Sequence, residues 1–273
     1  MSFKKLDNSK LLIQNIVLHQ MFAICNLAII PLRAEPNDRS EIVSQVLFGE
    51  HFEILEQQQQ WSKIKLHFDN YEGWVDSKQY QLINEKSFNE LSANVVVLNS
   101  DLVEYVTSAN TTFIPITLGA SLTFLNHDCI NTENFEFEGL KVSGIKPKAN
   151  IVTTSFMYLN APYLWGGKTP FGIDCSGFTQ MVYKLNGYNL LRDASQQSGQ
   201  GEALSFIEES EPGDLAFFDN EDGKIIHVGI IMENNHIIHA SGKVRIDRLD
   251  HLGIYNADVN RHTHRLRVIK KII

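Results

Sequence analysis

The chain has 273 residues, of which 43% are hydrophobic, and a formal net charge of −8 at pH 7. This composition is typical of a globular protein, and the length predicts two or three domains. The acidic balance argues against general nucleic-acid binding, and no apolar run is long enough to span a bilayer. We therefore expect no nucleic-acid partner and no membrane partner, and we expect a monomer.

Residues 1–21 are predicted to form an N-terminal extension. The run Leu11-Leu12-Ile13 is weakly similar to the apolar core of a signal peptide, but polar residues interrupt it and no small-residue cleavage site follows. We therefore expect a cytoplasmic protein, or an exported one if the native chain begins elsewhere. Three widely separated cysteines, Cys25, Cys129 and Cys175, do not form a disulfide framework, which fits a reducing compartment.

Two stretches of the chain have the pattern of small β-barrels. Residues 22–84 contain short alternating segments separated by turn residues, which is typical of an all-β domain. Residues 92–146 contain further strand-like pieces and predict a second barrel on weaker support. The rest, residues 147–273, is long enough for one compact α+β domain. The alternating segments of the first barrel are 23–27, 41–47, 52–55 and 61–66.

The most informative local pattern follows Cys175. Apolar residues recur after it at the i, i+3, i+4, i+7 spacing of one helical face, and Asn186-Gly187 then supplies a stop. Cys175 falls on the first turn, where unpaired backbone N–H groups and the helix dipole favour an anion. We therefore expect a lowered thiol pKa and a nucleophilic cysteine. The apolar positions are Phe178, Met181, Val182 and Leu185.

Two histidines lie in strands that are predicted over residues 224–232 and 236–240. If a three-residue loop joins these strands, Gly229 faces His239, and His227 lies on the same face as a diagonal neighbour of His239. A base and a group that orients it need this proximity, and the small Gly229 leaves room for both rings. The other histidines near the C-terminus are expected at the surface. These are His251, His262 and His264.

Less specific interpretations use the same atoms. A single histidine in an apolar strand is more often a packed core residue, but two on one face together with a cysteine at a helix start favour a site. Cys175, His227 and His239 could also be zinc ligands. No Cys-x-x-Cys or His-x-x-x-His pair lies around them, so we expect no metal and no cofactor.

Several motifs resemble the NlpC-type cysteine peptidases of peptidoglycan, over residues of about 150–273. An SH3-like front end makes the chain similar to the γ-D-glutamyl-L-diamino acid endopeptidases. The resemblance implies an α+β fold, in which a reduced papain-like catalytic domain follows one or two small SH3-like β-barrels. The peptidase motifs are 162–167, Asp174-Cys175-Ser176-Gly177-Phe178, 212–215, 227–230 and His239-Ala240; the SH3-like ones are 31–33, 48–50 and 71–75.

The resemblance also implies roles for individual residues. Cys175 would be the nucleophile, His227 the base and His239 the third member that orients it. Tyr163 would help to bind the oxyanion together with the backbone N–H of Cys175. Asp174, which alone predicts a helix cap, would also bind the free α-amino group of the substrate. Further substrate contacts are expected from Ser176, Trp165 and Ser195, and from Glu41 and Tyr71 of the first barrel.

The implied reaction is hydrolysis of the bond between γ-D-glutamate and a diamino acid, either meso-diaminopimelate or lysine. The implied partner is a murein peptide with a free N-terminal L-Ala, as in the recycling of wall peptides. Two alternatives stay open from the residues. One is a thiol amidase or acyltransferase that acts on another amide or on lipid. The other is a catalytically silent protein whose SH3-like domains bind peptidoglycan.

Overall fold

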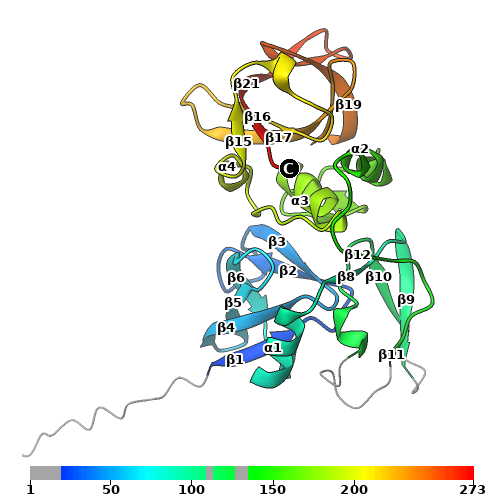
Figure 1. The fold of residues 1–273 in the computed structure, drawn as a ribbon. Coiled ribbons are helices and arrows are strands. Elements are labelled where there is room, and N and C mark those ends of the chain that lie inside the picture. Colours follow the sequence, from blue (N-terminus) through cyan, green and yellow to red (C-terminus); the bar gives the residue numbers. More distant parts are fainter. Residues whose placement is uncertain (1–19, 109–112, 127–134) are drawn as a thin grey trace, which may run out of the picture.

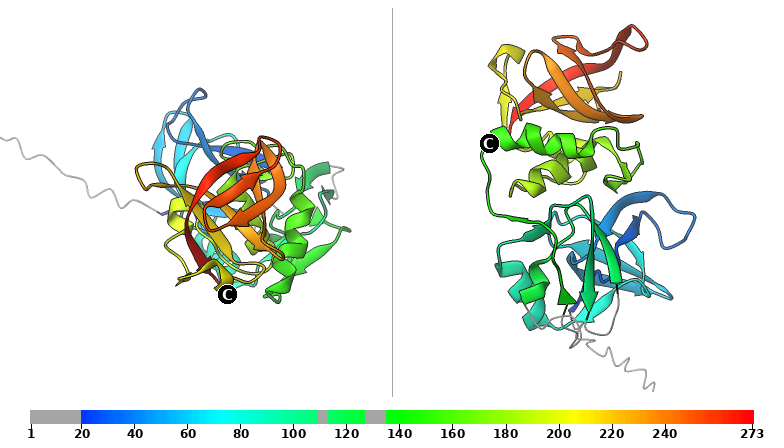
Figure 2. Two further views of the ribbon diagram at one scale, coloured as in Figure 1. Left: turned by 90° about the horizontal axis from the view of Figure 1, so that it is seen from above. Right: turned by 90° about the vertical axis from the view of Figure 1, so that its right-hand side faces the viewer.

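The computed structural model of the protein describes residues 20–108, 113–126 and 135–273. Cys129 and nearly all of the extension predicted for residues 1–21 lie outside the described residues. Within the described ranges, no helix has the length and apolar character needed to cross a membrane. Figures 1 and 2 show the N-terminal sheets at one end, the helices α2 and α3 in the middle, and the C-terminal sheet at the other end.

The first seven strands form one antiparallel sheet in the order β3-β2-β6-β5-β4-β1-β7. Alternate residues point inward, so that Ile30 and Leu32 of one strand both lie in the barrel core. This sheet confirms the small β-barrel that was predicted for the N-terminal part. Its strands are β1 (Met21–Ile24), β2 (Ile29–Arg33), β3 (Ile42–Leu47), β4 (His51–Gln58), β5 (Trp61–Leu66), β6 (Glu72–Asp76) and β7 (Gln81–Ile83).

The segment after the barrel begins with α1 (Glu85–Ala93) and continues as two small sheets, β10-β9-β11 and β12-β8. Phe124 of this segment packs edge-on against Phe48 of the barrel, with ring centroids 5.2 Å apart. A second barrel over residues 92–146 stays a prediction. The elements are β8 (Val97–Asn99), β9 (Val103–Ser108), β10 (Phe113–Thr117), η1 (Thr123–Asn126), β11 (Phe135–Glu136) and β12 (Lys141–Ser143).

The C-terminal part combines short helices with a seven-stranded sheet in the order β15-β21-β16-β17-β18-β19-β20. The long strand β21 pairs with both β16 and β20 and so closes the sheet on itself. The helical elements are α2 (Ala149–Ser155), η2 (Phe156–Tyr158), α3 (Cys175–Leu185), α4 (Ala194–Gln197) and η3 (Ile207–Glu209). The strands are β13 (Lys168–Thr169), β14 (Gly172–Ile173), β15 (Glu202–Leu204), β16 (Leu215–Asp219), β17 (Ile225–Met232), β18 (His236–Ser241), β19 (Lys243–Asp250), β20 (Gly253–Asn256) and β21 (Arg261–Lys271).

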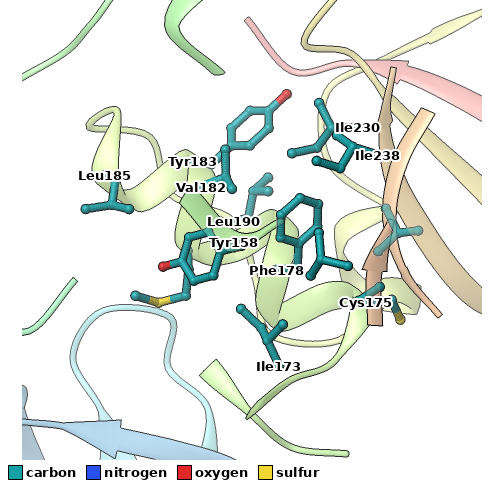
Figure 3. Close-up of a cluster of buried hydrophobic side chains, with 14 of the residues drawn as sticks. Tyr158, Ile173, Cys175, Phe178, Val182, Tyr183, Leu185, Leu190, Ile230 and Ile238 are labelled. Atoms are coloured by element: carbon teal, nitrogen blue, oxygen red, sulfur yellow. The ribbon is translucent and has the colours of Figure 1, made fainter. Parts of the chain in front are cut away.

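Helix α3 lies between this sheet and the N-terminal barrel, and all of its residues are buried. Figure 3 shows Phe178 and Val182 in one apolar cluster with Ile230 and Ile238 of the sheet. Burying one such large apolar side chain contributes roughly 1.5–3 kcal/mol, so the cluster fixes the helix in place. The predicted limits of the helix are confirmed, because it starts at Cys175 and ends at Leu185.

The barrel is joined to the C-terminal part by buried charges. Glu50 of the barrel accepts hydrogen bonds from Lys168 Nζ at 3.2 Å and from Lys184 Nζ at 2.6 Å. Burial alone would raise the pKa of Glu50, but the two ammonium groups outweigh it and lower the pKa to about 2. A Cβ on Gly166 would lie 2.3 Å from the Ile42 carbonyl oxygen, so only glycine lets this loop approach the barrel so closely.

Candidate active site

Cys175 is the first residue of α3 and is 6% exposed. Burial, with a smaller contribution from the Asp174 carboxylate, raises the pKa of its thiol to about 12. Hydrogen bonds from the backbone of Val228 and Ser176 lower the pKa by less than burial raises it. The prediction of a lowered thiol pKa is therefore wrong, because desolvation outweighs the favourable field at the helix start. The resting thiol keeps its proton and needs a base.

His227 and His239 lie next to each other, as the predicted strand register implied. Gly229 of β17 pairs with His239 of β18, which confirms the three-residue loop, and His227 Nε2 lies 2.8 Å from His239 Nδ1. A Cβ on Gly229 would lie 2.8 Å from His239 Cβ, so the missing side chain makes this approach possible. Burial lowers the pKa of His227 well below its usual value, and His239 and His264 add to this effect. His227 is therefore neutral and able to accept a proton.

Two further side chains complete this cluster, and the sequence did not reveal them. Asp247 Oδ2 of β19 lies 3.0 Å from His239 Nε2. His264 of β21 stacks on His227 with ring centroids 4.2 Å apart. The prediction that His264 lies at the surface is wrong, because its half-buried ring stacks on His227. Regular alternation would place His262 and His264 on one face, but a register shift between them interrupts β21, and His262 is exposed, as is His251, as predicted. The alternating residues 261–271 could have indicated a strand, but not which face is covered.

A cleft of about 510 Å³ opens above Cys175. This volume lies in the usual range of small-molecule sites, roughly 300–1,000 Å³. The barrel contributes one wall of the cleft, and the loops around α3 contribute the other. Every side chain that was predicted to contact the oxyanion or the substrate lines it, whereas His227 and His239 do not. The lining residues from the prediction are Glu41, Tyr71, Tyr163, Trp165, Asp174, Ser176 and Ser195.

Two acidic groups that line the cleft hold aromatic side chains, and one belongs to the barrel and the other to the start of α4. Trp165 Nε1 donates to Glu41 Oε1 at 2.5 Å, and the Tyr71 hydroxyl donates to both oxygens of Asp193 at 3.2 Å. Burial raises the pKa of Tyr71, and the Asp193 carboxylate adds to the effect, so the phenol stays protonated. The sequence interpretation missed Asp193, although it lies two residues before Ser195.

Asp174 is engaged more fully than its sequence neighbourhood suggested. Its side chain caps α3 by accepting from Gly177 N at 2.6 Å, which confirms the predicted cap. Arg192 donates to both carboxylate oxygens, at 3.0 and 2.6 Å, and its Nε donates to Ser44 Oγ of the barrel at 2.9 Å. Arg192 is 1% exposed, and sequence reasoning had missed it. Amine binding by Asp174 stays a prediction.

Tyr163 is half-buried at the cleft, in the loop that leads to β13. Burial raises the pKa of its hydroxyl, and the nearby Cys175 and Asp174 raise it further, so Tyr163 is a hydrogen-bond donor. In the described part of the chain, no group of three or more His, Cys, Asp or Glu side chains is arranged to hold a metal ion. The rings of His227 and His239 are hydrogen-bonded to each other instead.

Comparison with known proteins agrees with this arrangement. The NlpC/P60 family model matches residues 160–263, and a model described as bacterial dipeptidyl-peptidase Sh3 domain matches residues 32–79. A Bacillus subtilis (strain 168) protein named gamma-D-glutamyl-L-lysine dipeptidyl-peptidase is 30% identical over 217 residues, which are 73% of this chain and 72% of that protein. Dipeptidyl-peptidase 6 of Lysinibacillus sphaericus is 28% identical over 253 residues, 80% of this chain and 88% of that protein.

Solved structures show the same fold. The crystal structure of an NlpC/P60 family protein from Bacillus cereus ATCC 10987 superposes with a TM-score of 0.78 at 19% identity, over 92% of this chain and 99% of that one. An NlpC/P60 endopeptidase from Photobacterium damselae subsp. piscicida gives a TM-score of 0.68 at 15% identity, over 91% of this chain and 70% of that one. The match to the first structure extends through the barrel as well as the C-terminal part.

Proposed function

Because this chain belongs to the NlpC/P60 family of cysteine peptidases, we propose that it hydrolyses the γ-D-glutamyl bond to a diamino acid in short murein peptides with a free N-terminal L-Ala. The observation that carries this proposal is the pair of carboxylates, Glu41 from the barrel and Asp193 from the start of α4, that line the cleft beside Cys175. The names of the two relatives support dipeptide release, and one of them supports L-lysine as the diamino acid.

This pair of carboxylates suits an ammonium group. Glu41 of the barrel and Asp193 at the start of α4 offer carboxylate oxygens in the cleft, and Tyr71 of the barrel donates a hydrogen bond to Asp193. The oxygens of Asp174 already accept from Arg192, Gly166 and Gly177, which favours Glu41 and Asp193 as the amine ligands. Charge-assisted hydrogen bonds to such groups contribute about 1.5–3 kcal/mol each. Acetylation of the amine would remove its positive charge and with it these contacts.

The chemistry follows from the protonation states of the resting site. His227 takes the proton of Cys175, and the thiolate attacks the γ-carbonyl carbon of D-glutamate. The Tyr163 hydroxyl and the Cys175 backbone N–H stabilise the oxyanion. His227 then gives its proton to the departing amine of the diamino acid, which leaves a thioester. A water molecule attacks the thioester with His227 as base, and the thiol is regenerated as L-Ala-D-Glu departs.

The decisive experiment compares L-Ala-γ-D-Glu-L-Lys with its N-acetylated form, and repeats both with meso-diaminopimelate. We expect kcat/KM for the free peptide to exceed that for the acetylated one by about 100-fold or more, since at least one charge-assisted contact is lost. Mass spectrometry of the products should find L-Ala-D-Glu. Equal rates on both forms would contradict amine recognition, and no cleavage of either would favour another amide, a lipid substrate or wall binding.

The charge of Glu41 can be tested separately. Glu41→Gln keeps an oxygen for Trp165 but removes the negative charge, so we expect KM for the free tripeptide to rise about 10-fold while kcat changes little. The same substitution should have no effect on the slow cleavage of the acetylated peptide. Glu72→Gln is the matched control, because Glu72 lies on β6 outside the cleft and pairs with Lys63. An equal KM change in both variants would argue against an amine contact at Glu41.

A requirement for a free amine would exclude stems that are still attached to muramic acid. We therefore propose that the enzyme acts in the recycling of freed wall peptides, in the cytoplasm. Cell fractionation of the source bacterium tests this placement, and recovery of the native protein outside the cytoplasm would contradict it.

A further inference from the structure

A row of two buried hydrogen bonds joins the two histidines and continues to Asp247. His227 Nε2 lies 2.8 Å from His239 Nδ1, and His239 Nε2 lies 3.0 Å from Asp247 Oδ2. The three side chains belong to the successive strands β17, β18 and β19, and each residue is no more than 6% exposed. The row is therefore shielded from water over its whole length, where hydrogen bonds are stronger than in solvent.

Strand register and an ion pair fix the end of this row. His239 pairs with Arg245 across β18 and β19, so Asp247 lies two residues further on the same face, within diagonal reach of His239. Arg245 Nε donates to Asp247 Oδ2 at 2.7 Å, and Arg245 Nη2 donates to Oδ1 at 2.9 Å. Arg245 in turn pairs with the exposed Asp258. The buried carboxylate is thus compensated and held in one orientation.

Asp247 determines which nitrogen of each ring carries a proton. Its carboxylate is ionised, because His239 and Arg245 lower its pKa although burial alone would raise it, and an ionised carboxylate only accepts hydrogen bonds. His239 must therefore donate from Nε2. Burial lowers the pKa of His239, so the ring is neutral and its Nδ1 is an acceptor. His227 then donates from Nε2, which leaves its Nδ1 as the nitrogen without a proton.

We propose that Asp247 is a positioning residue that, through His239, keeps His227 in the tautomer whose Nδ1 accepts the proton of Cys175. The inference rests on the thiol mechanism of the proposed function, but not on the identity of the peptide. Asp247 also faces the positive charge that forms when His227 takes the proton, and so stabilises that state through His239. A row of Cys175, His227, His239 and Asp247 thus replaces a three-residue system.

The other charged or titratable groups around His227 do not supply this acceptor. His264 of β21 stacks on the ring face of His227, and burial lowers its pKa to about 4, so it is neutral. Cys175 of α3 is a neutral thiol at rest. Asp174 beside it is paired with Arg192. Asp247 on β19 therefore determines the direction in which the hydrogen bonds of the row are donated.

The test compares Asp247→Ala and Asp247→Asn with the control Asp258→Asn. The Ala variant removes the acceptor, whereas Asn keeps one oxygen and loses the charge. We expect kcat for the tripeptide to fall about 10- to 100-fold in Asp247→Ala and less in Asp247→Asn, with KM unchanged, because Asp247 does not line the cleft. Asp258→Asn makes the same chemical change at a residue that contacts Arg245 but not His239, and this variant should keep the wild-type kcat.

Two readouts do not depend on the peptide. The first is the rate of Cys175 alkylation by iodoacetamide, measured as a function of pH up to its plateau. Peptide mass spectrometry quantifies alkylation of Cys175 separately from that of Cys25 and Cys129. The plateau rate should fall about 10-fold in Asp247→Ala, with the native fold verified by circular dichroism. The second is the nitrogen-15 spectrum of histidine-labelled wild-type protein, in which His239 should carry its proton on Nε2.

The outcomes separate this inference from the proposed function. Wild-type protein that fails to cleave the tripeptide would contradict the proposed substrate, yet both peptide-independent readouts would still decide the role of Asp247. A His239 proton found on Nδ1 in the wild-type protein would overturn the inference even if the variants do not fold. The inference would also fail if folded Asp247→Ala kept kcat and the alkylation rate within about twofold of wild type.

Discussion

Replacing Cys175 with alanine is expected to reduce kcat/KM for the free tripeptide by about 10⁴- to 10⁶-fold, the range seen when a member of a nucleophile–base system is removed. The two carboxylates that would hold the amine, Glu41 and Asp193, are untouched by this change. We therefore expect isothermal titration calorimetry to find tripeptide binding to Cys175→Ala close to that of the wild type. Product mass spectrometry measures the loss of turnover.

Cys25→Ala provides the matched control for the loss of a thiol. Cys25 is fully buried in the barrel, with its sulfur 3.2 Å from the Leu27 carbonyl oxygen, and burial raises its pKa to about 12. It lies outside the cleft lining, so its loss should leave kcat unchanged. Turnover that survives in Cys175→Ala, or that disappears only in Cys25→Ala, would exclude Cys175 as the nucleophile.

Replacing Arg192 with methionine should lower the free energy of unfolding by about 3–5 kcal/mol, because it leaves the Asp174 carboxylate buried without its partner. The effect should reach catalysis as well, since Asp174 caps the turn on which Cys175 lies. We expect urea denaturation to show the loss of stability, and peptide cleavage by the remaining folded protein to be reduced.

Ser44→Ala distinguishes the contribution of the Arg192–Asp174 ion pair to stability from that of the Arg192–Ser44 hydrogen bond to the barrel. It removes only the hydrogen bond from Arg192 Nε and should cost about 1 kcal/mol. The double variant Arg192→Met with Asp174→Asn should recover part of the stability, because no unpaired charge remains. The ion-pair account fails if Arg192→Met unfolds within about 1 kcal/mol of the wild type.

The features that could be predicted from the sequence have local causes. Helix α3 follows from apolar spacing and from Asp174 and Gly187 at its two ends, and the pairing of Gly229 with His239 follows from the loop length alone. The three residues of the proposed thiol mechanism lie on these elements. Local rules therefore predicted the position of Cys175 on its helix and the proximity of the two histidines.

The features that escaped prediction depend on contacts between distant parts of the chain. Arg192 reaches Ser44 across 148 positions, and the stacking of His264 on His227 requires β21 to close the sheet. Asp247 lies only eight positions from His239, but its role required knowing that β19 pairs next to β18. Neither hydrophobic periodicity nor a short motif indicates which strands pair with each other in the sheet.

The thiol pKa shows where a local rule gives the wrong sign. The start of a helix does favour an anion, and Cys175 was expected to ionise easily for that reason. The packing that fixes α3 also removes water from the sulfur, and desolvation is the largest influence on its pKa. Sequence identifies the helix start, but only the folded structure reveals the burial.

The buried ion pairs of Glu50 make the peptidase part depend on the barrel. Lys168 and Lys184 belong to the peptidase half, yet the carboxylate between them comes from the barrel. A recombinant fragment without residues 20–84 would leave Lys168 and Lys184 without their carboxylate partner. A fusion protein with a different barrel would need an acidic side chain at the position of Glu50. Protein engineers should therefore treat the barrel as part of the enzyme rather than as a detachable tag.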